Sequence, residues 1–242
     1  MPPLLEVRSV GKRFGGLQAL AGVSFALEAG EIAGIIGPNG AGKTTLFNVI
    51  TGFYAPDEGQ VLVRGFDVTG EPSHRICRRG VARTFQISKP FANLTVLQTV
   101  RIGALNRVTG MAAATARALA VLERVGLDGK RDQLGRHLTV VERKRLELAR
   151  ALATGPALLL LDEVAAGLTP TEVHEMIALV RTIAADGVSV LIIEHVLEAV
   201  MRLSARIVVL NHGQVIAEGP PRELVEDARV IEAYLGEAYT LA

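Results

Sequence analysis

The chain has 242 residues, and its 26 basic and 25 acidic side chains give a formal net charge of +1, which argues against nucleic-acid binding through bulk charge. Hydrophobic residues make up 49% and aromatic residues 4%, with a mean hydropathy of +0.33; these values indicate a large aliphatic core, typical of α/β layers, and some apolar surface that a partner covers. The longest apolar runs, such as 157–161, are far too short to cross a bilayer. The single Cys77 excludes an intrachain disulfide and fits a reducing compartment. We also expect no signal peptide.

The first third of the chain is predicted to form strands and turns. Residues 5–10 and 23–27 alternate apolar and polar side chains with a period of two, and 61–64 is a further short strand between two glycines. Residues 31–36 form an apolar run that is typical of a strand buried on both faces. Residues 45–50 come soon after it and are predicted to start a helix.

A glycine-rich loop separates that strand from that helix. Its residues are Gly37, Pro38, Asn39, Gly40, Ala41, Gly42, Lys43, Thr44 and Thr45, and they fit the phosphate-loop pattern G-x-x-x-x-G-K-[ST] over 37–44. Glycines let backbone N–H groups curl around phosphate oxygens, Lys43 supplies a point charge for the β- and γ-phosphates, and the Thr44 hydroxyl is a ligand for Mg²⁺. Because the flanking strand and helix N-terminus are also present, the motif predicts a nucleotide site rather than an ordinary turn.

The rest of the chain is predicted to be helical first and then to return to strands. From about 95 to 153 the pattern is helical, with an Ala-rich helix at 111–124 and another at 143–153. Apolar runs at 157–161 and 188–193 have strand length. Between them one helical face carries Val173, Met176, Ile177, Val180 and Ile183. This alternation predicts a mainly parallel sheet with helices on both faces, into which the helical middle is inserted.

Two acids, Asp162 and Glu163, follow the apolar run at 157–161. Acids at a strand end are often helix caps, and in isolation that interpretation is favoured. Beside a phosphate loop the strand is expected to lie next to the loop strand, so that Asp162 reaches the Mg²⁺ shell, through water, and Glu163 orients or deprotonates the attacking water. In this context we expect the functional interpretation to hold.

Two further polar residues are candidates for the same site. His195 follows the strand at 188–193, from where a histidine can contact the γ-phosphate, and Gln86 lies where strands give way to helices. In isolation, a loop histidine and a surface amide are the ordinary interpretations. The remaining histidines show no metal-ligand spacing: His74, His137, His174 and His212.

Taken together, these motifs resemble the nucleotide-binding domain of ABC transporters over nearly the whole chain. Segments 13–20, 45–53, 82–86 and 230–236 are similar to the ATP-binding subunit of branched-chain amino acid uptake systems. The resemblance implies one ABC ATP-binding domain over 1–242. Its expected parts are an α/β P-loop NTPase (RecA-like) core at 1–86 and 156–242 with a mainly parallel sheet, an antiparallel β subdomain, and an inserted α-helical subdomain at about 87–155.

The resemblance also implies cofactors and roles for single residues. The cofactors are ATP and Mg²⁺. Phe14 would stack on the adenine, and His195 would be the switch histidine. Gln86 would sense both Mg²⁺ and the attacking water, so it is expected to act in catalysis with Glu163 and His195, and in metal binding with Thr44 and Asp162.

The expected partners follow from the way the family works, as a head-to-tail pair. ATP lies between the phosphate loop of one chain and the signature motif of the other. The partners are therefore a second ATP-binding chain, identical or different, membrane permease subunits, and indirectly an extracytoplasmic solute-binding protein, but no nucleic acid. The expected location is peripheral, on the cytoplasmic face of the inner membrane.

The chain departs from the family pattern in its signature. Where the family has roughly Leu-Ser-Gly-Gly-Gln, this chain has Leu138, Thr139, Val140, Val141 and Glu142. Thr139 keeps a hydroxyl for the γ-phosphate of the partner's ATP. We expect the β-branched Val141, which replaces a glycine at the closest approach to phosphate, to crowd the nucleotide or to forbid a needed backbone conformation. Val164 and Thr169 are smaller departures, at positions where proline and aspartate are common.

The predicted function is an ATP-hydrolysing importer subunit that couples hydrolysis to uptake of branched-chain or related amino acids through a separate permease. One alternative is the mainly regulatory half of a heterodimer, because its signature is degenerate. A second is a module that binds ATP without turnover, against which Glu163, His195 and Gln86 argue. A non-transport ABC ATPase acting on nucleic acid or ribosomes lacks support because we find no basic extension or long coiled coil. A small-molecule P-loop kinase would leave the signature-like helix unexplained.

Overall fold

A computed structural model describes residues 2–85, 91–194 and 196–235, and two sheets lie at the centre of this part of the chain. One is a four-stranded antiparallel sheet in the order β2-β1-β4-β5. The other has six strands in the order β10-β9-β3-β8-β7-β6, all parallel to their neighbours except β10, which is antiparallel to β9. The strands are β1 (Leu5–Phe14), β2 (Leu17–Leu27), β3 (Ile32–Ile36), β4 (Glu58–Val63), β5 (Phe66–Asp67), β6 (Val81–Arg83), β7 (Leu158–Asp162), β8 (Ser189–Ile193), β9 (Arg206–Asn211) and β10 (Gln214–Gly219).

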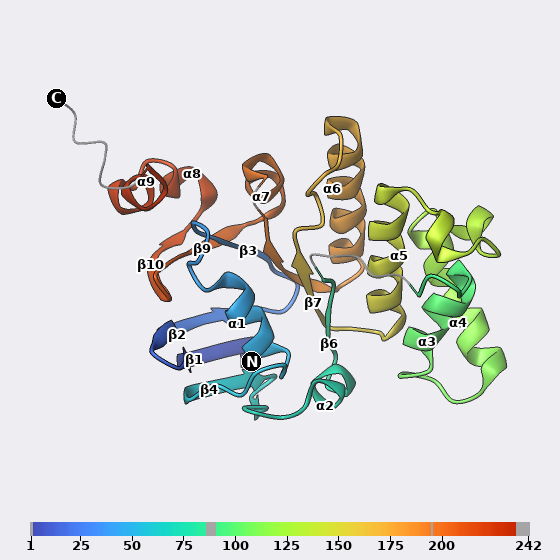
Figure 1. Cartoon of the computed structure of the whole chain (residues 1–242), viewed down its shortest axis with the longest axis horizontal. Coiled ribbons are helices and arrows are strands. Elements are labelled where there is room, and N and C mark those ends of the chain that lie inside the picture. The colour runs from blue at the N-terminus through green and yellow to red at the C-terminus, as the bar shows by residue number, and fades with distance from the viewer. Residues whose placement is uncertain (1, 86–90, 195, 236–242) are drawn as a thin grey trace.

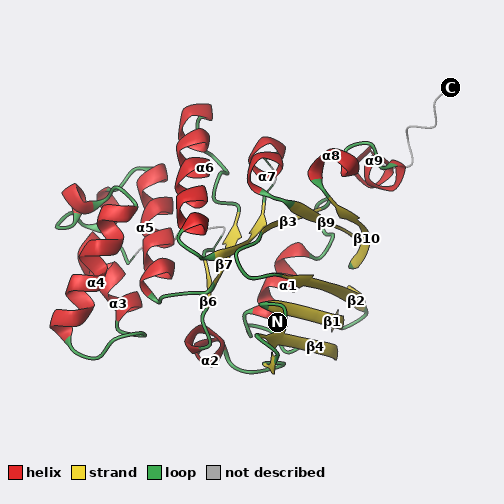
Figure 2. Cartoon of the chain, turned by 180° about the vertical axis from the view of Figure 1, so that it is seen from behind, coloured by secondary structure: helices red, strands yellow, loops and turns green. Residues whose placement is uncertain are grey.

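The helices form layers around these sheets. They are α1 (Lys43–Ile50), α2 (Ser73–Arg78), α3 (Val96–Ala104), α4 (Met111–Arg124), α5 (Val140–Ala153), α6 (Pro170–Ala185), α7 (Leu197–Leu203), α8 (Pro221–Leu224) and α9 (Ala228–Leu235). Helix α1 lies between the two sheets, whereas α6 and α7 lie on the other side of the six-stranded sheet (Figure 1). Helices α3, α4 and α5 pack together at one end of the molecule (Figure 2). The predicted α/β fold, with a mainly parallel sheet and an antiparallel β unit, is confirmed.

Strand β7 is apolar at nearly every position, without alternation, because both of its faces are covered. Leu158 and Leu160 belong to the core cluster that contains α1 and the inner face of the antiparallel sheet. Leu159 and Leu161 belong to the cluster that contains α5 and α6. Because a helix or sheet covers each face, every side chain of the strand is buried, and a strand of this kind needs apolar residues at every position.

The first two strands are longer than the sequence pattern predicts. The pairing of β1 with β2 shifts register at three places between Val7 and Arg13, and Ser9 has a positive φ of 46°. Each irregularity changes which side chains face the core. The period of two is therefore lost after residue 10 although the strand continues to Phe14.

The six-stranded sheet brings the predicted motifs to one edge. In the parallel ladder, Ile35 of β3 and Asp162 of β7 both pair with Ile193 of β8, so the three strands end at the same level. The loop after β3, the acids after β7 and the segment after β8 thus share this edge, where ligands bind in open α/β sheets. None of the helices in the described ranges combines the length and the hydrophobicity needed to cross a membrane.

Candidate functional site

The loop between β3 and α1 needs glycine at two positions for steric reasons. Gly37 has a φ of 153°, and a Cβ atom there would lie 2.0 Å from the carbonyl oxygen of Leu210. Gly42 has a φ of 102°, and a Cβ atom there would lie 2.5 Å from the carbonyl oxygen of Ala19. Both contacts are with backbone, which cannot move aside. Any side chain at either position would therefore open the loop and move its N–H groups.

Lys43, the first residue of α1, is held inside the loop. Its side chain is buried, and its Nζ donates hydrogen bonds to the carbonyl oxygens of Gly37, at 2.6 Å, and Pro38, at 2.9 Å. Burial lowers the pKa of Lys43, and the nearby carboxylates of Glu163 and Asp162 partly oppose this shift. The ammonium group is therefore fixed between the loop backbone and the two acids that follow β7.

A cavity of about 440 Å³ opens beside this loop and brings predicted residues together from three parts of the chain. Predicted residues in its lining are Phe14, the loop from Asn39 to Thr45, and Glu163. Gly37 and Pro38 do not line it; Pro38 lines an adjoining cavity with Arg229 and Glu232. The lining also contains Leu17, Gln18, Ala19 and His212, which the sequence analysis missed.

Three of the missed residues begin strand β2, and the fourth lies in a tight turn. Leu17 starts β2 directly after the turn that follows Phe14, and His212 has a positive φ of 44° in the turn between β9 and β10. A histidine next to Gly213 between two strands gives a turn signal. That signal does not reveal that the turn lies against the phosphate loop, where the carbonyl of Ala41 accepts a hydrogen bond from the Gly213 N–H.

Phe14 lines the cavity with a partly exposed ring. Its side chain is 41% exposed, and its ring meets the ring of Tyr54 edge to face, with centroids 5.1 Å apart. The ammonium of Lys12 lies 5.6 Å from the Phe14 centroid. A supported, partly exposed aromatic ring has the geometry for stacking on a flat heterocycle.

Asp162 is buried in a polar network at the end of β7. Its Oδ2 accepts a hydrogen bond of 2.6 Å from Arg83, its backbone N–H donates to the Thr84 hydroxyl, and Arg83 also donates to Asn48 Oδ1 at 2.6 Å. The guanidinium of Arg83 lies over the rings of Phe47 and Phe85, at 5.4 and 5.2 Å. No local sequence signal marks Arg83, because the pairing of β6 with β7 brings it to Asp162 from 79 positions away.

The oxygen donors near the loop fit a magnesium ion. Thr44 offers a hydroxyl and Asp162 a carboxylate, and hard oxygen ligands of this kind are those that Mg²⁺ prefers. Within the described ranges we find no cluster of three or more His, Cys, Asp or Glu side chains that would hold a metal.

Glu163 sits in a backbone turn with unusual geometry. Its φ is 51°, in the left-handed region that side chains other than glycine rarely adopt. Its N–H donates to the carbonyl of Ile193 at 2.9 Å, and its carbonyl accepts from Lys144 Nζ at 2.8 Å and from the Ala166 N–H. Because the side chain lines the cavity, this turn sets the direction of the carboxylate toward the space above the phosphate loop.

A second acid, Glu194, is buried directly behind that turn. It is 3% exposed, and its Oε1 accepts a hydrogen bond of 2.7 Å from the N–H of Ala165. Burial raises the pKa of Glu194 to about 7, although the Ala165 N–H and Lys144 favour its charged form. The sequence analysis assigned it no role, because a carboxylate after a strand gives no sign of its own burial.

The pKa of Glu194 predicts a pH-dependent effect of Glu194→Gln. Between the unfolded value near 4.5 and the folded value of about 7 the folded state binds more protons, so its ionisation lowers the free energy of unfolding as the pH rises. Glutamine keeps an acceptor for the Ala165 N–H but does not ionise, so its free energy of unfolding does not fall in this way as the pH rises. From about pH 5 to about pH 8, the variant should gain up to about 3 kcal/mol over the wild type in urea unfolding. If the two proteins differ in their free energy of unfolding by the same amount at both pH values, this prediction is wrong.

Two predicted residues, Gln86 and His195, lie outside the described residues. The described segments next to them end at the site: Thr84 accepts a hydrogen bond from the Asp162 N–H, and the carbonyl of Ile193 accepts from Glu163. Their predicted roles stay predictions.

Thr139 does not line the cavity of its own chain. It is the N-cap of α5 and forms a capping box, in which its hydroxyl accepts from the Glu142 N–H and the Glu142 carboxylate accepts from the Thr139 N–H. This box starts the helix at Val140, three residues before the predicted start. Val141 lies in the first turn and is absent from the described positive-φ residues. The expectation that Val141 crowds the nucleotide or forbids a needed backbone conformation stays a prediction.

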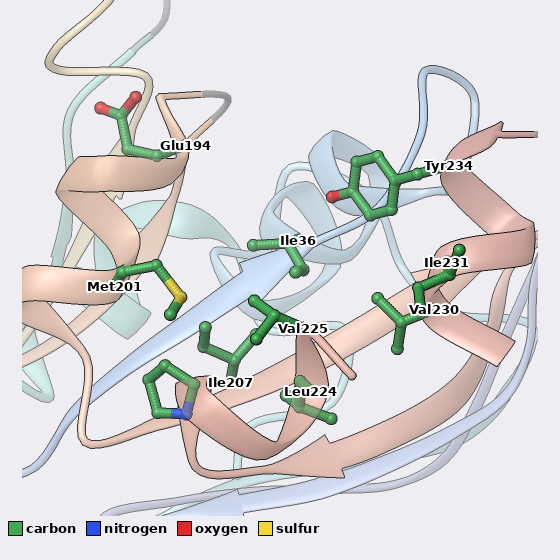
Figure 3. A pocket seen from close by; sticks show the side chains of 10 residues that line it. Ile36, Glu194, Met201, Ile207, Leu224, Val225, Val230, Ile231 and Tyr234 are labelled. Carbon is green, nitrogen blue, oxygen red and sulfur yellow. The ribbon is translucent and has the colours of Figure 1, made fainter. Parts of the chain in front are cut away.

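A separate cavity of about 480 Å³ lies beneath α8 and α9. Figure 3 shows aliphatic side chains from β3, α7, β9 and the C-terminal helices around it, whereas the carboxylate of Glu194 points away from them. The phenol of Tyr234, whose pKa burial raises, accepts a hydrogen bond from the backbone of Gly37. Because this lining is almost entirely aliphatic, it does not offer the donors that a triphosphate requires.

The chain is similar to ATP-binding proteins of ABC transporters in both sequence and structure. The family model described as "ABC transporter" matches residues 20–166, and one described as "Branched-chain amino acid ATP-binding cassette transporter" matches 214–240. The high-affinity branched-chain amino acid transport ATP-binding protein BraF of Pseudomonas aeruginosa is 39% identical, over 98% of this chain and 99% of that protein. A nucleotide-free ATP-binding cassette from an ABC transporter superposes with a TM-score of 0.89 at 34% identity, covering 98% of this chain and all of that one. A bacterial ABC transporter cassette solved as a dimer has a TM-score of 0.81 at 25% identity, covering 90% and 99%.

Proposed function

Because this chain belongs to the ABC transporter family of ATP-binding cassettes, we propose that it hydrolyses ATP to ADP and phosphate and thereby drives a separate permease. The observation that carries this proposal is the cavity that Phe14, the phosphate loop from Asn39 to Thr45 and Glu163 line together. Its volume of about 440 Å³ is within the range of sites that hold a small-molecule ligand. It combines an aromatic surface, backbone N–H donors, a cation and a carboxylate.

Different residues of the site bind different parts of the nucleotide. Phe14 stacks on the adenine, and the loop from Asn39 to Thr45 surrounds the phosphates with N–H groups at the N-terminus of α1. Lys43 neutralises charge on the β- and γ-phosphates. Thr44 and Asp162, with Gln86, would hold Mg²⁺, which would supply positive charge to neutralise the phosphates.

Catalysis requires a water molecule in line with the γ-phosphate. Glu163 orients this water and accepts its proton, since its carboxylate lines the cavity on the side of the phosphate loop. His195 contacts the γ-phosphate, and Gln86 links the water and the metal. Arg83 acts through Asp162, which it holds in place with a hydrogen bond of 2.6 Å.

The proposed solute is a branched-chain or related amino acid. Two findings support this: the C-terminal match over 214–240 to the branched-chain amino acid cassette family, and the similarity to BraF, a high-affinity branched-chain amino acid transport ATP-binding protein. The solute would meet a binding protein and a permease rather than this chain. On this proposal the chain lies on the cytoplasmic face of the membrane.

A groove on the surface supports contact with a permease. Its volume is about 510 Å³, and it runs between the segments around α2 and β6 on one side and α3 and α5 on the other. Phe53, Phe85 and Ile102 line it and are 63%, 44% and 45% exposed. Exposed apolar side chains gathered in one groove indicate a protein partner, and a helix of the permease is the occupant that we propose. Co-expression with the permease should then move the chain into the membrane fraction.

A second cassette would complete the site. Thr139 lies at the N-terminus of α5, a position suited to contact with an anion, and we propose that it meets the γ-phosphate bound to the partner chain. Val141 is in the same first turn. Its two methyl groups would then lie against the nucleotide.

Val141→Gly is therefore expected to raise ATP turnover of the assembled two-cassette complex. Removing both methyl groups relieves the crowding at the partner's nucleotide, and we expect an increase of about three- to tenfold, the equivalent of about 1 kcal/mol in the barrier. Steady-state turnover of the reconstituted complex measures this. Val140→Gly, which loses the exposed neighbouring side chain, is the matched control. Equal turnover of Val141→Gly and wild type would show that the signature is not weakened.

Turnover by the purified chain tests the proposed function itself. ATP hydrolysis is measured over a range of protein concentrations, with Glu163→Gln as the blank. A rate that rises faster than linearly and is lost in the blank is expected if two copies form working sites. Tight binding of MgATP without turnover would mean that a different second cassette is needed. Failure to bind MgATP would contradict the proposal.

A further inference from the structure

The turn that carries Glu163 is held in place by three groups, two from the end of β8 and the residue after it and one from α5. The carbonyl of Ile193, at the end of β8, accepts from the Glu163 N–H. Lys144, from α5, donates to the Glu163 carbonyl at 2.8 Å. Glu194, directly after β8, accepts from the Ala165 N–H at 2.7 Å. Backbone groups on both sides of the Glu163 Cα are therefore fixed from outside the turn.

Such fixing is needed because the turn is strained. A residue with a side chain in the left-handed region costs roughly 1 kcal/mol or more relative to a right-handed or extended backbone. Glu163 has a φ of 51°, so without these contacts the segment would relax. Rotation of the backbone at this point would carry the carboxylate away from the cavity that it lines.

The charges around the turn match this arrangement. Lys144 is partly buried, and burial lowers its pKa, while Glu194, Glu147 and Glu163 oppose the shift. Its ammonium thus lies among three acids and also hydrogen-bonds the Glu163 carbonyl. Lys144 stands in the second turn of the helix that begins after Thr139. It therefore ties the start of α5 to the backbone of Glu163.

We propose that Lys144 and Glu194 are positioning residues for ATP hydrolysis, which hold the Glu163 turn so that the carboxylate faces the attacking water. This inference rests on the proposed function, in which Glu163 is the acceptor of the proton. Neither residue lines the nucleotide cavity. Their loss should therefore lower kcat and leave ATP binding almost unchanged.

The test compares four variants in the assembled complex. Lys144→Met removes the donor and keeps the length of the side chain, whereas Lys144→Arg keeps a cationic donor. Glu194→Leu removes the acceptor for Ala165, whereas Glu194→Gln keeps one. Lys144→Met and Glu194→Leu should each lower kcat about 10- to 100-fold with KM for ATP within about threefold of wild type, since a shift of about 1 Å in a reacting group has effects of this size. Lys144→Arg and Glu194→Gln should stay within about fivefold of wild type.

Arg145→Met is the matched control. Arg145 is the next residue of α5 and pairs with Glu175 on the surface, so this variant loses the same charge from the same helix without touching the turn. Its kcat should equal that of wild type. Thermal melting shows whether each variant is folded; Lys144→Gln replaces Lys144→Met, with the same expectation, if the latter does not fold.

The outcomes separate this inference from the proposed function. If wild type hydrolyses ATP, Glu163→Gln does not, and Lys144→Met and Glu194→Leu keep normal kcat, the positioning role is wrong and the proposed function stands. A rise in KM for ATP without a fall in kcat would likewise overturn the positioning role, because that result would assign the two residues to binding. If Glu163→Gln retains full turnover, the proposed role of Glu163 fails first.

Discussion

Replacing Glu163 by glutamine is expected to lower the kcat of ATP hydrolysis by at least about 10²-fold, because an amide cannot accept the proton of the attacking water. Glutamine has nearly the same shape as glutamate, so the cavity keeps its volume and its phosphate loop. Lys43 and Phe14 are untouched, and the Kd for MgATP should therefore stay within about threefold of the wild-type value. Single-turnover hydrolysis and equilibrium binding of MgATP measure the two quantities separately.

Glu175→Gln provides the control for this change. Glu175 is an exposed acid that pairs with Arg145 on the surface, so its neutralisation removes the same charge far from the cavity lining. Its kcat should match that of wild type. Unaltered kcat in Glu163→Gln would show that another group takes the proton, and would remove Glu163 from the mechanism.

Arg83→Met is expected to destabilise the protein by about 3–5 kcal/mol, because it removes the cation from a buried ion pair. The Arg83 and Asp162 side chains are 6% and 2% exposed and lie 2.6 Å apart, so almost no solvent screens the charge left on Asp162. Methionine fills much of the space against Phe47 and Phe85, which limits the loss of packing. Urea unfolding measures the change in free energy.

Two further variants show whether the loss of stability comes from the buried charge or from packing. Arg79→Met breaks a surface pair with Glu71 and should cost about 1 kcal/mol or less. Adding Asp162→Asn to Arg83→Met removes the buried charge and should recover half or more of the lost stability. If the double variant is no more stable than Arg83→Met, the cost arises from packing and not from the negative charge left on Asp162.

The sequence predicted the parts of the site that depend on local chemistry. The phosphate loop is contiguous, so its glycines, Lys43 and Thr44 are readable in a single motif. Asp162 and Glu163 were found because a strand buried on both faces has a distinct apolar run and a visible end. Each of these two signals is contained within a few consecutive residues, where spacing alone limits the geometry.

Other features of the site were invisible because the residues that make them are distant in the chain. Arg83 meets Asp162 across 79 positions, and His212 reaches the cavity from a turn between the last two strands of the sheet. Val141 was predicted to crowd the nucleotide or to forbid a needed backbone conformation; the structure adds that the Thr139 capping box places it in the first turn of α5, and the prediction itself stays a prediction. A motif comparison reports the residue types and not the conformation that their neighbours impose.

The amino-acid sequence by itself determined the fold class, the family and the position of the phosphate loop, because period, run length and motif spacing are local properties of the chain. Only the tertiary structure decided how the acids after β7 are held. Lys144, Ile193 and Glu194 come from two other elements and meet at the Glu163 turn. The left-handed backbone of Glu163 is stable because these contacts offset its strain, and contacts between distant segments form only when the sheet and α5 have packed together.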